Sequence, residues 1–348
     1  MTRPTRDVVV STFPPLRDGI ARYADQFADG LRPPFAVIRI GLPGSSADRV
    51  ARLNGWLRPL RLVLYTRRSD RVHLMWHHEF YISGRVPSRI AAYASLAFTL
   101  RTRRTQVIVH ERLPHAPVRA GVLRAAVLSV EAAARRAFFR SAAGLVFHSQ
   151  WEKDLFAENC PGVLNDRNTR VADHGEFFRP LARESRQAAR VELGLPQEKF
   201  VFVCIGFMGP HKGFDRAVRA FAQLPEGLAE LHLVGSPLFE NATLRKYVDE
   251  LRSEVERVAG AHFKVTYVDD EEFDRWITAA DAVIAPYRKV SSSGVVARAR
   301  MLATRVIAAN AGALPEQIGP DDILISSDDQ LVDAMARLAS ASYRSDSD

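Results

Sequence analysis

The chain has 348 residues, enough for two domains of ordinary size, with the 47% hydrophobic and 25% charged content of a soluble globular protein. No segment approaches the ~18 uninterrupted apolar residues of a membrane span, and the amino terminus leads into a strand pattern rather than a signal sequence. Cys160 and Cys204 are too few for a disulfide framework or a cysteine zinc site. We therefore expect a cytoplasmic protein.

The net charge of +8 is unevenly distributed. Residues 1–180 hold 28 Lys and Arg and 15 Asp and Glu, a balance of +13, whereas residues 181–348 hold 20 and 25, a balance of −5. Such asymmetry indicates that the first half faces something anionic, such as a membrane surface, a phosphorylated acceptor or nucleic acid.

Strand and helix patterns alternate through the first half. Apolar runs suited to buried strands lie at 7–13, 35–42, 72–80, 105–111, 144–149 and 170–175. Helical patterns lie between them, for example at 19–31 and 120–140. Strands separated by helices predict a parallel sheet with right-handed crossovers.

The same alternation occurs in the second half. Strands are expected at 199–206, 230–236, 264–269, 281–287, 305–311 and 323–327, and helices near 213–224, 241–258, 271–280, 293–303 and 328–340. The polar stretch 179–199 is the expected join. The predicted fold is α/β, with two doubly wound, Rossmann-like domains, 1–180 and 181–348. Whether the last helix packs back on the first domain stays open.

The segment "GFMGPHKGFDRAVRAF", residues 206–221, leads from a buried strand into a helix. Gly206, Gly209 and Gly213 allow a close approach of the backbone to a ligand, and the helix start offers unpaired N–H groups to an anion. Lys212 adds a positive charge at the same point. By itself the pattern also fits a solvated glycine-rich connection.

Doubly wound domains bind ligands beyond the carboxyl ends of their strands. Polar residues and glycines occur at many of these ends, namely Gly19, His77, His78, Glu79, His110, His148 and His174 in the first half, and Gly235, Tyr287, Ser291–Gly294, Gly312 and Glu316 in the second. A single histidine there is often structural. Several that converge on one cleft indicate a functional site.

In order and spacing these motifs resemble a retaining GT-B glycosyltransferase of family 4, in the glycosyl transferases group 1. The matching pieces run nearly end to end: "STFPPLRDGIARYA" (11–24), "HHEF" (77–80), "VIVHE" (107–111), "LVFHSQWEKDLF" (145–156), "VADHG" (171–175), and the stretches 191–221, 231–236, 269–287 and 291–316. The resemblance implies a GT-B fold, with two domains facing a central cleft. It implies an enzyme that transfers a sugar from a nucleotide-diphosphate sugar to an acceptor hydroxyl with retention of configuration.

The resemblance places the donor sugar nucleotide in the second domain. Lys212 matches the family's lysine at the donor diphosphate, and Gly19 matches a loop of the first domain that approaches the donor phosphates. The expected donor-binding residues are Gly19, Gly206, Lys212, Tyr287, Ser292, Ser293, Gly294, Val295, Arg298 and Glu316. The family's arginine after the first glycine is absent, because Phe207 stands there.

The acceptor is implied for the first domain, where His78, Glu79 and His174 are expected to bind a sugar, lipid-linked or small-molecule acceptor. His110 matches a histidine near the transferred sugar and is the candidate catalytic residue, through a hydrogen bond to a sugar hydroxyl. It is not expected to be a nucleophile, since no carboxylate is placed beside it in the manner of an activated pair. The leaving diphosphate would then accept the acceptor's proton.

No metal or cofactor is expected. The family requires no DxD motif, and "VDDEE" at 268–272 is predicted to be a loop followed by a helix start.

Two glutamates common in the family are missing. Aligning backwards from "RVIAANAG" places their positions at Val290 and Arg298. A guanidinium has no hydrogen-bond acceptor and cannot replace a carboxylate that holds ribose hydroxyls. We therefore predict that Arg298 binds a donor phosphate, in place of the arginine lost at Phe207.

The sequence lacks the motifs of several other classes of protein. A nicotinamide enzyme needs G-x-G-x-x-G after the first strand, and "STFPPLRDGIAR" lacks it. No basic-aromatic motif of a nucleic-acid-binding fold appears, so no nucleic acid partner is expected. A sugar-nucleotide epimerase, or a catalytically altered or inactive relative acting as a partner protein, are the alternatives that stay open.

Two arginine-rich segments, 51–71 and 89–104, also carry apolar residues such as Trp56, Leu57 and Phe98. Helices of this composition can lie on an anionic membrane, although an ordinary helix with a solvated basic side has the same pattern. We expect at most weak, salt-sensitive association with the inner face of the membrane.

Overall fold

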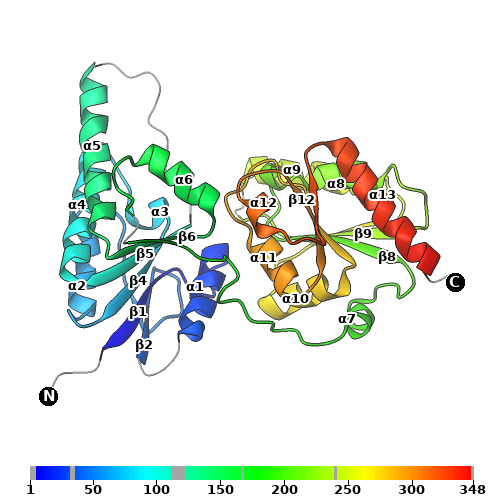
Figure 1. Ribbon diagram of the computed structural model, residues 1–348, viewed down its shortest axis with the longest axis horizontal. Coiled ribbons are helices and arrows are strands. Elements are labelled where there is room, and N and C mark those ends of the chain that lie inside the picture. Colours follow the sequence, from blue (N-terminus) through cyan, green and yellow to red (C-terminus); the bar gives the residue numbers. More distant parts are fainter. Residues whose placement is uncertain (1–4, 32–35, 111–121, 166–167, 239–240, 346–348) are drawn as a thin grey trace. The chain divides into compact units, whose positions relative to one another are not determined.

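The computed structural model describes residues 5–31, 36–110, 122–165, 168–238 and 241–345 (Figure 1). The chain forms two compact units, residues 1–177 and residues 178–348. Each unit has its own parallel sheet and its own core, as the alternating strand and helix patterns predict. The division follows Phe177, whereas the sequence analysis places it after residue 180.

The sheet of the first unit has seven strands in the order β3-β2-β1-β4-β5-β6-β7, and the recorded pairings are all parallel. The strands are β1 (Arg6–Ser11), β2 (Ala36–Gly41), β3 (Arg49–Val50), β4 (Arg71–Trp76), β5 (Arg104–Val109), β6 (Gly144–Phe147) and β7 (Thr169–Val171). The chain order reverses between β1 and β4, so this is the switch point beyond which doubly wound sheets bind ligands. Strand β3 was not predicted, because two residues are too few to show a period.

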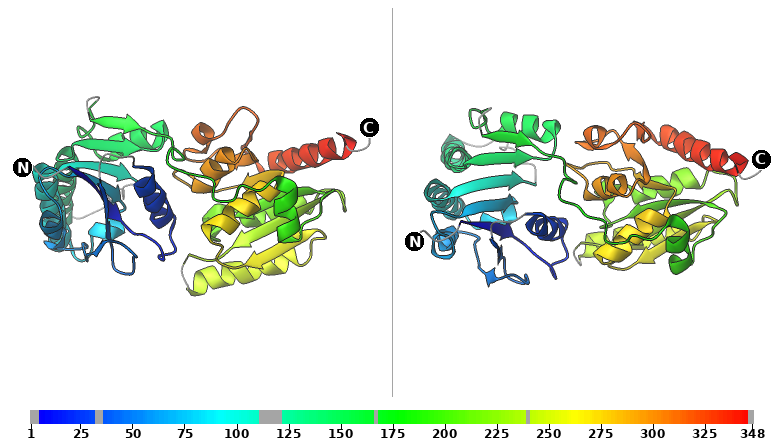
Figure 2. Two further views of the ribbon diagram at one scale, coloured as in Figure 1. Left: turned by 90° about the horizontal axis from the view of Figure 1, so that it is seen from below. Right: turned by 60° about the horizontal axis from the view of Figure 1, so that its bottom comes forward.

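Helices cover both faces of this sheet, with α4 and α5 on one face and α1 on the other (Figures 1 and 2). The helical segments are α1 (Gly19–Gly30), the 3-10 turn η1 (Arg58–Leu60), α2 (Arg61–Tyr65), α3 (His78–Tyr81), α4 (Val86–Thr102), α5 (Val122–Arg140) and α6 (Gln150–Asn159). Residues 51–71 thus form only short helical pieces, not one long helix.

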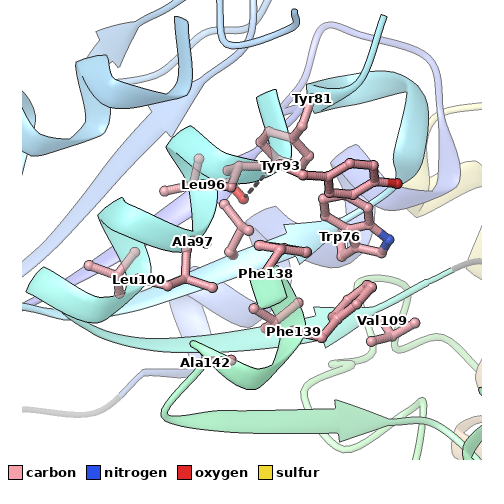
Figure 3. Close-up of a cluster of buried hydrophobic side chains, with 14 of the residues drawn as sticks. Trp76, Tyr81, Tyr93, Leu96, Ala97, Leu100, Val109, Phe138, Phe139 and Ala142 are labelled. Atoms are coloured by element: carbon pink, nitrogen blue, oxygen red, sulfur yellow. Dashed lines mark hydrogen bonds between the residues drawn. The ribbon is translucent and has the colours of Figure 1, made fainter. Parts of the chain in front are cut away.

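The core of the first unit lies between the sheet and the pair α4 and α5 (Figure 3). The Trp76 ring is fully buried at the end of β4, with its centroid 4.7 Å from that of Phe138 and 5.5 Å from that of Tyr81. Burying each large side chain of this kind stabilises the fold by on the order of 1.5–3 kcal/mol. This core fixes the carboxyl end of β4, from which His77, His78 and Glu79 follow.

The second sheet has six strands in the order β10-β9-β8-β11-β12-β13. They are β8 (Phe200–Ile205), β9 (Ala229–Gly235), β10 (Ala261–Val265), β11 (Ala282–Ala285), β12 (Arg305–Ala309) and β13 (Ile323–Ile325). The expected strand at 264–269 is misplaced, because β10 pairs with β9 from Ala261 to Val265. As an edge strand with polar and exposed residues, β10 lacks the apolar run used to predict buried strands.

Two sets of helices cover the second sheet. The helical segments are α7 (Arg186–Leu193), the 3-10 turn η2 (Pro210–Lys212), α8 (Phe214–Phe221), α9 (Ala242–Val255), α10 (Asp270–Ala279), α11 (Gly294–Met301), α12 (Leu314–Gln317) and α13 (Asp328–Ser345). One core packs the sheet against α8, α9 and α13, and the other packs it against α7, α10 and α11. The last helix therefore packs within its own unit, where it contacts α8.

Helix α7 lies within the expected join at 179–199 and is absent from the predicted helices. Ser185 caps it by accepting a hydrogen bond from the Ala188 N–H at 3.3 Å, and Ala189 is buried against the second core. The helix start predicted within "VDDEE" is confirmed, since the Asp269 side chain accepts from the Glu272 N–H at 2.9 Å. No described helix is both long enough and apolar enough to cross a membrane.

Candidate functional site

The glycine-rich loop of the second unit begins where β8 ends. Gly206 has φ +121° and Gly213 has φ +66°, backbone conformations that favour glycine. A side chain at Gly213 would collide with the carbonyl oxygen of Pro286, which follows β11. A Cβ at Gly206 would lie 3.5 Å from the Val295 side chain, at the start of α11. The loop is therefore packed against the carboxyl end of β11 and the amino end of α11.

Lys212 stands at the end of η2, within this loop. Its Nζ lies 3.9 Å from the centroid of the Tyr287 ring, and Tyr287 itself is buried. A lysine over an aromatic face is held by the negative charge density of the ring. No ion pair involves Lys212 in the described part of the chain, so its charge is available to an anion at the loop.

The loop is braced by an ion pair that sequence analysis missed. Both guanidinium Nη atoms of Arg288 donate to the Asp215 carboxylate, at 2.7 and 2.6 Å, and Nη1 also donates to the Pro210 carbonyl at 2.9 Å. Burial would raise the pKa of Asp215, but the hydrogen bonds and charge of Arg288, with Arg219, hold it below its usual value. Asp215 and Arg288 are far apart in sequence, and no local pattern pairs them.

The serine-rich segment before α11 is held against α12. The Ser293 hydroxyl accepts from the Val296 N–H at 3.3 Å, and the Ser293 N–H donates to Gln317 Oε1 at 2.7 Å. A side chain at Gly312, whose φ is +57°, would collide with the carbonyl oxygen of Val290. Gly294 and Val295 thus occupy the first positions of α11, whose N–H groups have no partner within the helix.

These contacts bring most of the expected donor-binding residues together within the second unit. The loop with Gly206 and Lys212, the Tyr287 ring, and the segment from Ser292 to Val295 meet at the carboxyl ends of β8 and β11. Glu316 lies in the first turn of α12, beside the Gln317 that holds Ser293.

Arg298 does not belong to this group. Its side chain is buried, and Nε donates to Asp274 Oδ1 at 2.7 Å, while Oδ2 of the fully buried Asp274 accepts from the Leu181 N–H at 2.9 Å. The guanidinium also lies over the rings of Phe178 and Phe273. This guanidinium joins α11 to α10 and to residues 178–181, and its Nη2 is buried without a hydrogen-bond partner among the described residues. The phosphate contact stays a prediction.

In the first unit, three histidines from different strand ends gather around Tyr23. Ring centroids lie 4.7 Å apart for Tyr23 and His110, 5.0 Å for His110 and His148, and 4.5 Å for His148 and His174. His110 follows β5, His148 follows β6 and His174 follows β7, so parallel strands deliver them to one edge. The structure thus brings together the predicted His110 and His174, and adds Tyr23 and His148, which the prediction of site residues omitted.

All three histidines are neutral at pH 7. Burial lowers the pKa of His174 to about 4, and burial with the neighbouring histidines holds the pKa values of His110 and His148 well below their usual range. The His110 Nε2 lies 3.4 Å from the Met75 sulfur. Neutral imidazoles can donate and accept hydrogen bonds, so the cluster is suited to hydroxyl groups rather than to binding by positive charge.

His78 and Glu79 lie on α3, and their recorded contacts are with residues outside this cluster. His78 Nδ1 is 3.2 Å from the Tyr93 hydroxyl. Glu79 lines a pocket of about 420 Å³ together with Leu42, Pro43, Arg52, Leu53, Asn54, Arg58 and Phe80. The pocket thus combines one carboxylate with two exposed arginines.

Gly19 is the first residue of α1, and Asp18 caps this helix by accepting from the Ala21 N–H at 2.6 Å. A Cβ at Gly19 would meet no described atom within 4 Å, so packing within the described structure does not require a glycine there. Glu111, the last residue of the predicted strand at 105–111, lies outside the described residues.

Solved structures of similar architecture cover nearly the whole chain. The HepE protein of Anabaena in complex with UDP has a TM-score of 0.69 at 17% identity, over 97% of this chain and 93% of that one. Sucrose-phosphate synthase from Thermosynechococcus elongatus has a TM-score of 0.66 at 15% identity, over 97% and 90%. Likeness at this level of identity shows the fold, and the fold is GT-B.

Sequence comparison finds a match for part of the chain. Residues 199–341 match the family model described as glycosyl transferases group 1. A D-inositol 3-phosphate glycosyltransferase of Streptomyces scabiei is 30% identical over 177 residues, 49% of this chain and 37% of that protein, and one of Jonesia denitrificans is 36% identical over 149 residues, 41% and 34%. The chain thus spans little more than a third of the curated relatives it matches.

The two parallel sheets thus have the GT-B fold, and within the second unit residues 199–341 match the glycosyl transferases group 1.

Proposed function

We propose that this protein is a glycosyltransferase that moves a sugar from a nucleotide-diphosphate sugar to an acceptor hydroxyl. The observation that carries the proposal is the meeting of the Gly206–Gly213 loop, Lys212 and the start of α11 in the second unit. Helix N-termini and glycine loops bind phosphates through their N–H groups, and lysine supplies the charge. HepE, of similar fold, is known in complex with UDP and with UDP-glucose.

In this proposal the second unit stabilises the leaving group. As the glycosidic bond to the diphosphate breaks, negative charge develops on the diphosphate oxygens. Lys212 and the N–H groups of Gly294 and Val295 meet that charge, and no metal is required for this step. The acceptor attacks from the face on which the diphosphate departs, the diphosphate oxygen takes the acceptor's proton, and configuration is retained.

His110 has a polar but uncharged role. Because its pKa is held well below the usual range, its imidazole is neutral and contributes a hydrogen bond to a hydroxyl of the transferred sugar. The His148 ring packs against the His110 ring, and the His174 ring packs against that of His148. Together they hold the His110 imidazole in place within the cluster.

The acceptor is proposed to bind in the Glu79 pocket of the first unit. Its carboxylate accepts hydrogen bonds from hydroxyl groups, and Arg52 and Arg58 suit an acceptor that carries phosphate. The relatives named above are D-inositol 3-phosphate glycosyltransferases, which fits an acceptor of this chemistry. We expect Glu79→Gln to raise the KM for the acceptor while leaving donor affinity unchanged.

The donor site is tested with a thermal-shift panel of UDP-, GDP-, ADP- and TDP-sugars, because a ligand that binds the folded state raises its stability. One of them should raise Tm, and Lys212→Ala should weaken that donor at least roughly tenfold, as expected for loss of a charge-assisted contact of about 1.5–3 kcal/mol. Lys246→Ala, at an exposed lysine of α9, is the matched control. Unchanged donor affinity in Lys212→Ala would contradict the diphosphate assignment.

The same protein and sugar nucleotides also test the two alternatives, an epimerase and an inactive relative. An epimerase would convert the donor without any acceptor, which NMR of the sugar nucleotide detects. An inactive relative would bind donor without forming product with any sugar acceptor. The absence of both family glutamates, at Val290 and Arg298, makes this control necessary.

Weak membrane association is a second proposal for the first unit. Trp56 and Leu57 are exposed in the turn before η1, Leu64 on α2 and Phe98 on α4, among several arginines. Apolar side chains beside arginines suit an anionic bilayer surface. We expect salt-sensitive sedimentation with anionic vesicles but not with neutral ones, reduced in Trp56→Ser/Leu57→Ser. Equal sedimentation with neutral vesicles would contradict it.

A further inference from the structure

A second cluster of potential ligands lies on the second sheet, away from the glycine loop. Glu230 and His232 are two residues apart on β9, so both side chains point to the same face, and His262 is the β10 residue paired with His232. All three lie in the first four residues of their strands, whereas the glycine loop follows the last residue of β8. The cluster is therefore separate from the proposed donor site.

The ligand atoms of these three residues lie within 4.8 Å of one another. Glu230 Oε2 is 3.1 Å from His232 Nε2 and 3.5 Å from His262 Nε2. In a tetrahedral zinc site with bonds near 2.0–2.1 Å, neighbouring ligand atoms are about 3.3 Å apart. The two Glu–His distances thus already match those between ligands of one ion.

The contact of Glu230 with Lys199 leaves one oxygen of its carboxylate available to a metal ion. Lys199 Nζ lies 3.1 Å from Glu230 Oε1, which leaves Oε2 facing the two histidines. His232 is buried and fixed, whereas the His262 side chain is 51% exposed and can rotate. Its ring stacks on the His232 ring at 4.5 Å between centroids, so the two imidazoles lie side by side next to Glu230 Oε2.

A pocket of about 570 Å³ adjoins the cluster, lined by Leu193, Gly194, Leu195, Pro196, Lys264 and Trp276 besides the three residues themselves. Three protein ligands with an open fourth position are the arrangement in which zinc retains a water molecule. Two imidazoles and one carboxylate favour Zn²⁺ and similar transition metals over Mg²⁺ or Ca²⁺, which prefer oxygen ligands.

We propose that Glu230, His232 and His262 bind one transition-metal ion of the Zn²⁺ class, which clips the edge strand β10 to β9. The site is independent of the proposed sugar transfer, and it leaves the donor step without a metal. Because the unfolded chain does not hold the three ligands together, the bound ion stabilises the fold. Metal ions at this site therefore act on stability and not on the chemistry at the glycine loop.

The experiment uses the full chain, stripped of metal and free of any histidine tag. Titration with Zn²⁺ against a chromophoric chelator should show one equivalent bound, and Co²⁺ should give the strong visible bands of a four-coordinate site. His262→Ala should weaken Zn²⁺ at least about tenfold, since even loss of a residue that only orients a ligand costs 10–100-fold. Glu272→Gln, a nearby carboxylate outside the cluster, is the control and should bind Zn²⁺ as the wild type does.

Two results would overturn the proposal. One is the absence of stoichiometric Zn²⁺ binding by the wild type at micromolar free metal. The other is equal Zn²⁺ affinity in wild type and His262→Ala, which would place any bound ion elsewhere, for instance at the His110 cluster. Donor affinity, measured in parallel, should be the same with Zn²⁺ and after chelation.

Discussion

The two units place functional groups at the carboxyl ends of their strands by different means. In the second unit the backbone does so: Gly213 and Gly312 let loops pack where a side chain would collide, and Gly206 has a backbone conformation that favours glycine. In the first unit side chains do so, as His110, His148 and His174 converge from three strand ends around Tyr23. A site built by backbone depends on glycine at fixed positions. A site built by side chains depends on burial that keeps the imidazoles neutral.

The largest effect is expected at the buried ion pair of the second unit. Arg298→Glu places a second carboxylate beside the fully buried Asp274, and breaking a buried pair typically costs about 3–5 kcal/mol. Urea denaturation should show this loss. Arg257→Glu, at an exposed arginine of the same unit, should change stability little. A stable Arg298→Glu protein that has lost donor binding would instead restore the phosphate-binding interpretation.

Acid should destabilise the first unit through its histidine cluster. Each histidine has a folded pKa below the unfolded value of about 6.5, so the unfolded chain binds more protons between those values. Stability is full above pH 6.5 and falls as pH drops toward about 4, the folded pKa of His174, by about 1.4 kcal/mol per pH unit for each histidine.

Hydrogen exchange, corrected for the pH dependence of chemical exchange, measures this loss at β5 and β6. The His148→Phe variant should show a shallower dependence, since one titrating group is removed. Protection of β5 and β6 that does not change between pH 7 and pH 5 would mean that the cluster is not held neutral by the fold.

A smaller loss is expected for Gly213→Ala. It combines a left-handed backbone with a collision at the Pro286 carbonyl, and strain of this kind costs about 1–3 kcal/mol. Gly227→Ala is the matched control, because Gly227 has φ +80° but open space around its Cβ position. Thermal denaturation should therefore show a greater loss for Gly213→Ala, accompanied by weaker donor binding. Equal losses would show that close packing of the loop contributes nothing.

The smallest effect on stability, and one of opposite sign, is expected for Gly19→Ala. Alanine is better than glycine in a helix by about 0.5–1 kcal/mol, and its Cβ meets no described atom within 4 Å. If Gly19 serves the donor, turnover should fall while Tm stays equal or rises slightly. A variant with unchanged kcat/KM would remove Gly19 from the site.

The sequence allowed the fold to be predicted where strands are apolar on both faces. The six strands of the second sheet include five at the expected positions, and the exception, β10, lies at the edge with His262 and Lys264 among its residues. Helix α7 was missed because only a few of its residues, such as Ala189, are buried in an otherwise polar stretch. Local periodicity reports burial, and edges and surface helices have little of it.

For the site, local motifs were informative and long-range pairings were not. The glycine loop with Lys212 is recognisable in the sequence because it lies within eight residues. The contact of Lys212 with Tyr287 could not be predicted, because the two residues are far apart in the chain. The ion pair of Arg298 was not foreseen because its partner, Asp274, lies on another helix, and nothing at residue 298 reveals a buried carboxylate nearby. The Asp215–Arg288 pair was missed for the same reason.

The edges of the two sheets have a consequence for self-association. Within the described residues, the outermost strands are β3 with two residues, β7 and β13 with three each, and β10 with five. An unpaired edge invites another chain to add a strand, and short or charged edges offer too few N–H and C=O groups for that addition. Copies of this chain are thus not expected to join sheet to sheet, and β10, with Lys264 exposed along it, is the strand where mutation to apolar residues would most readily create a fibrous aggregate.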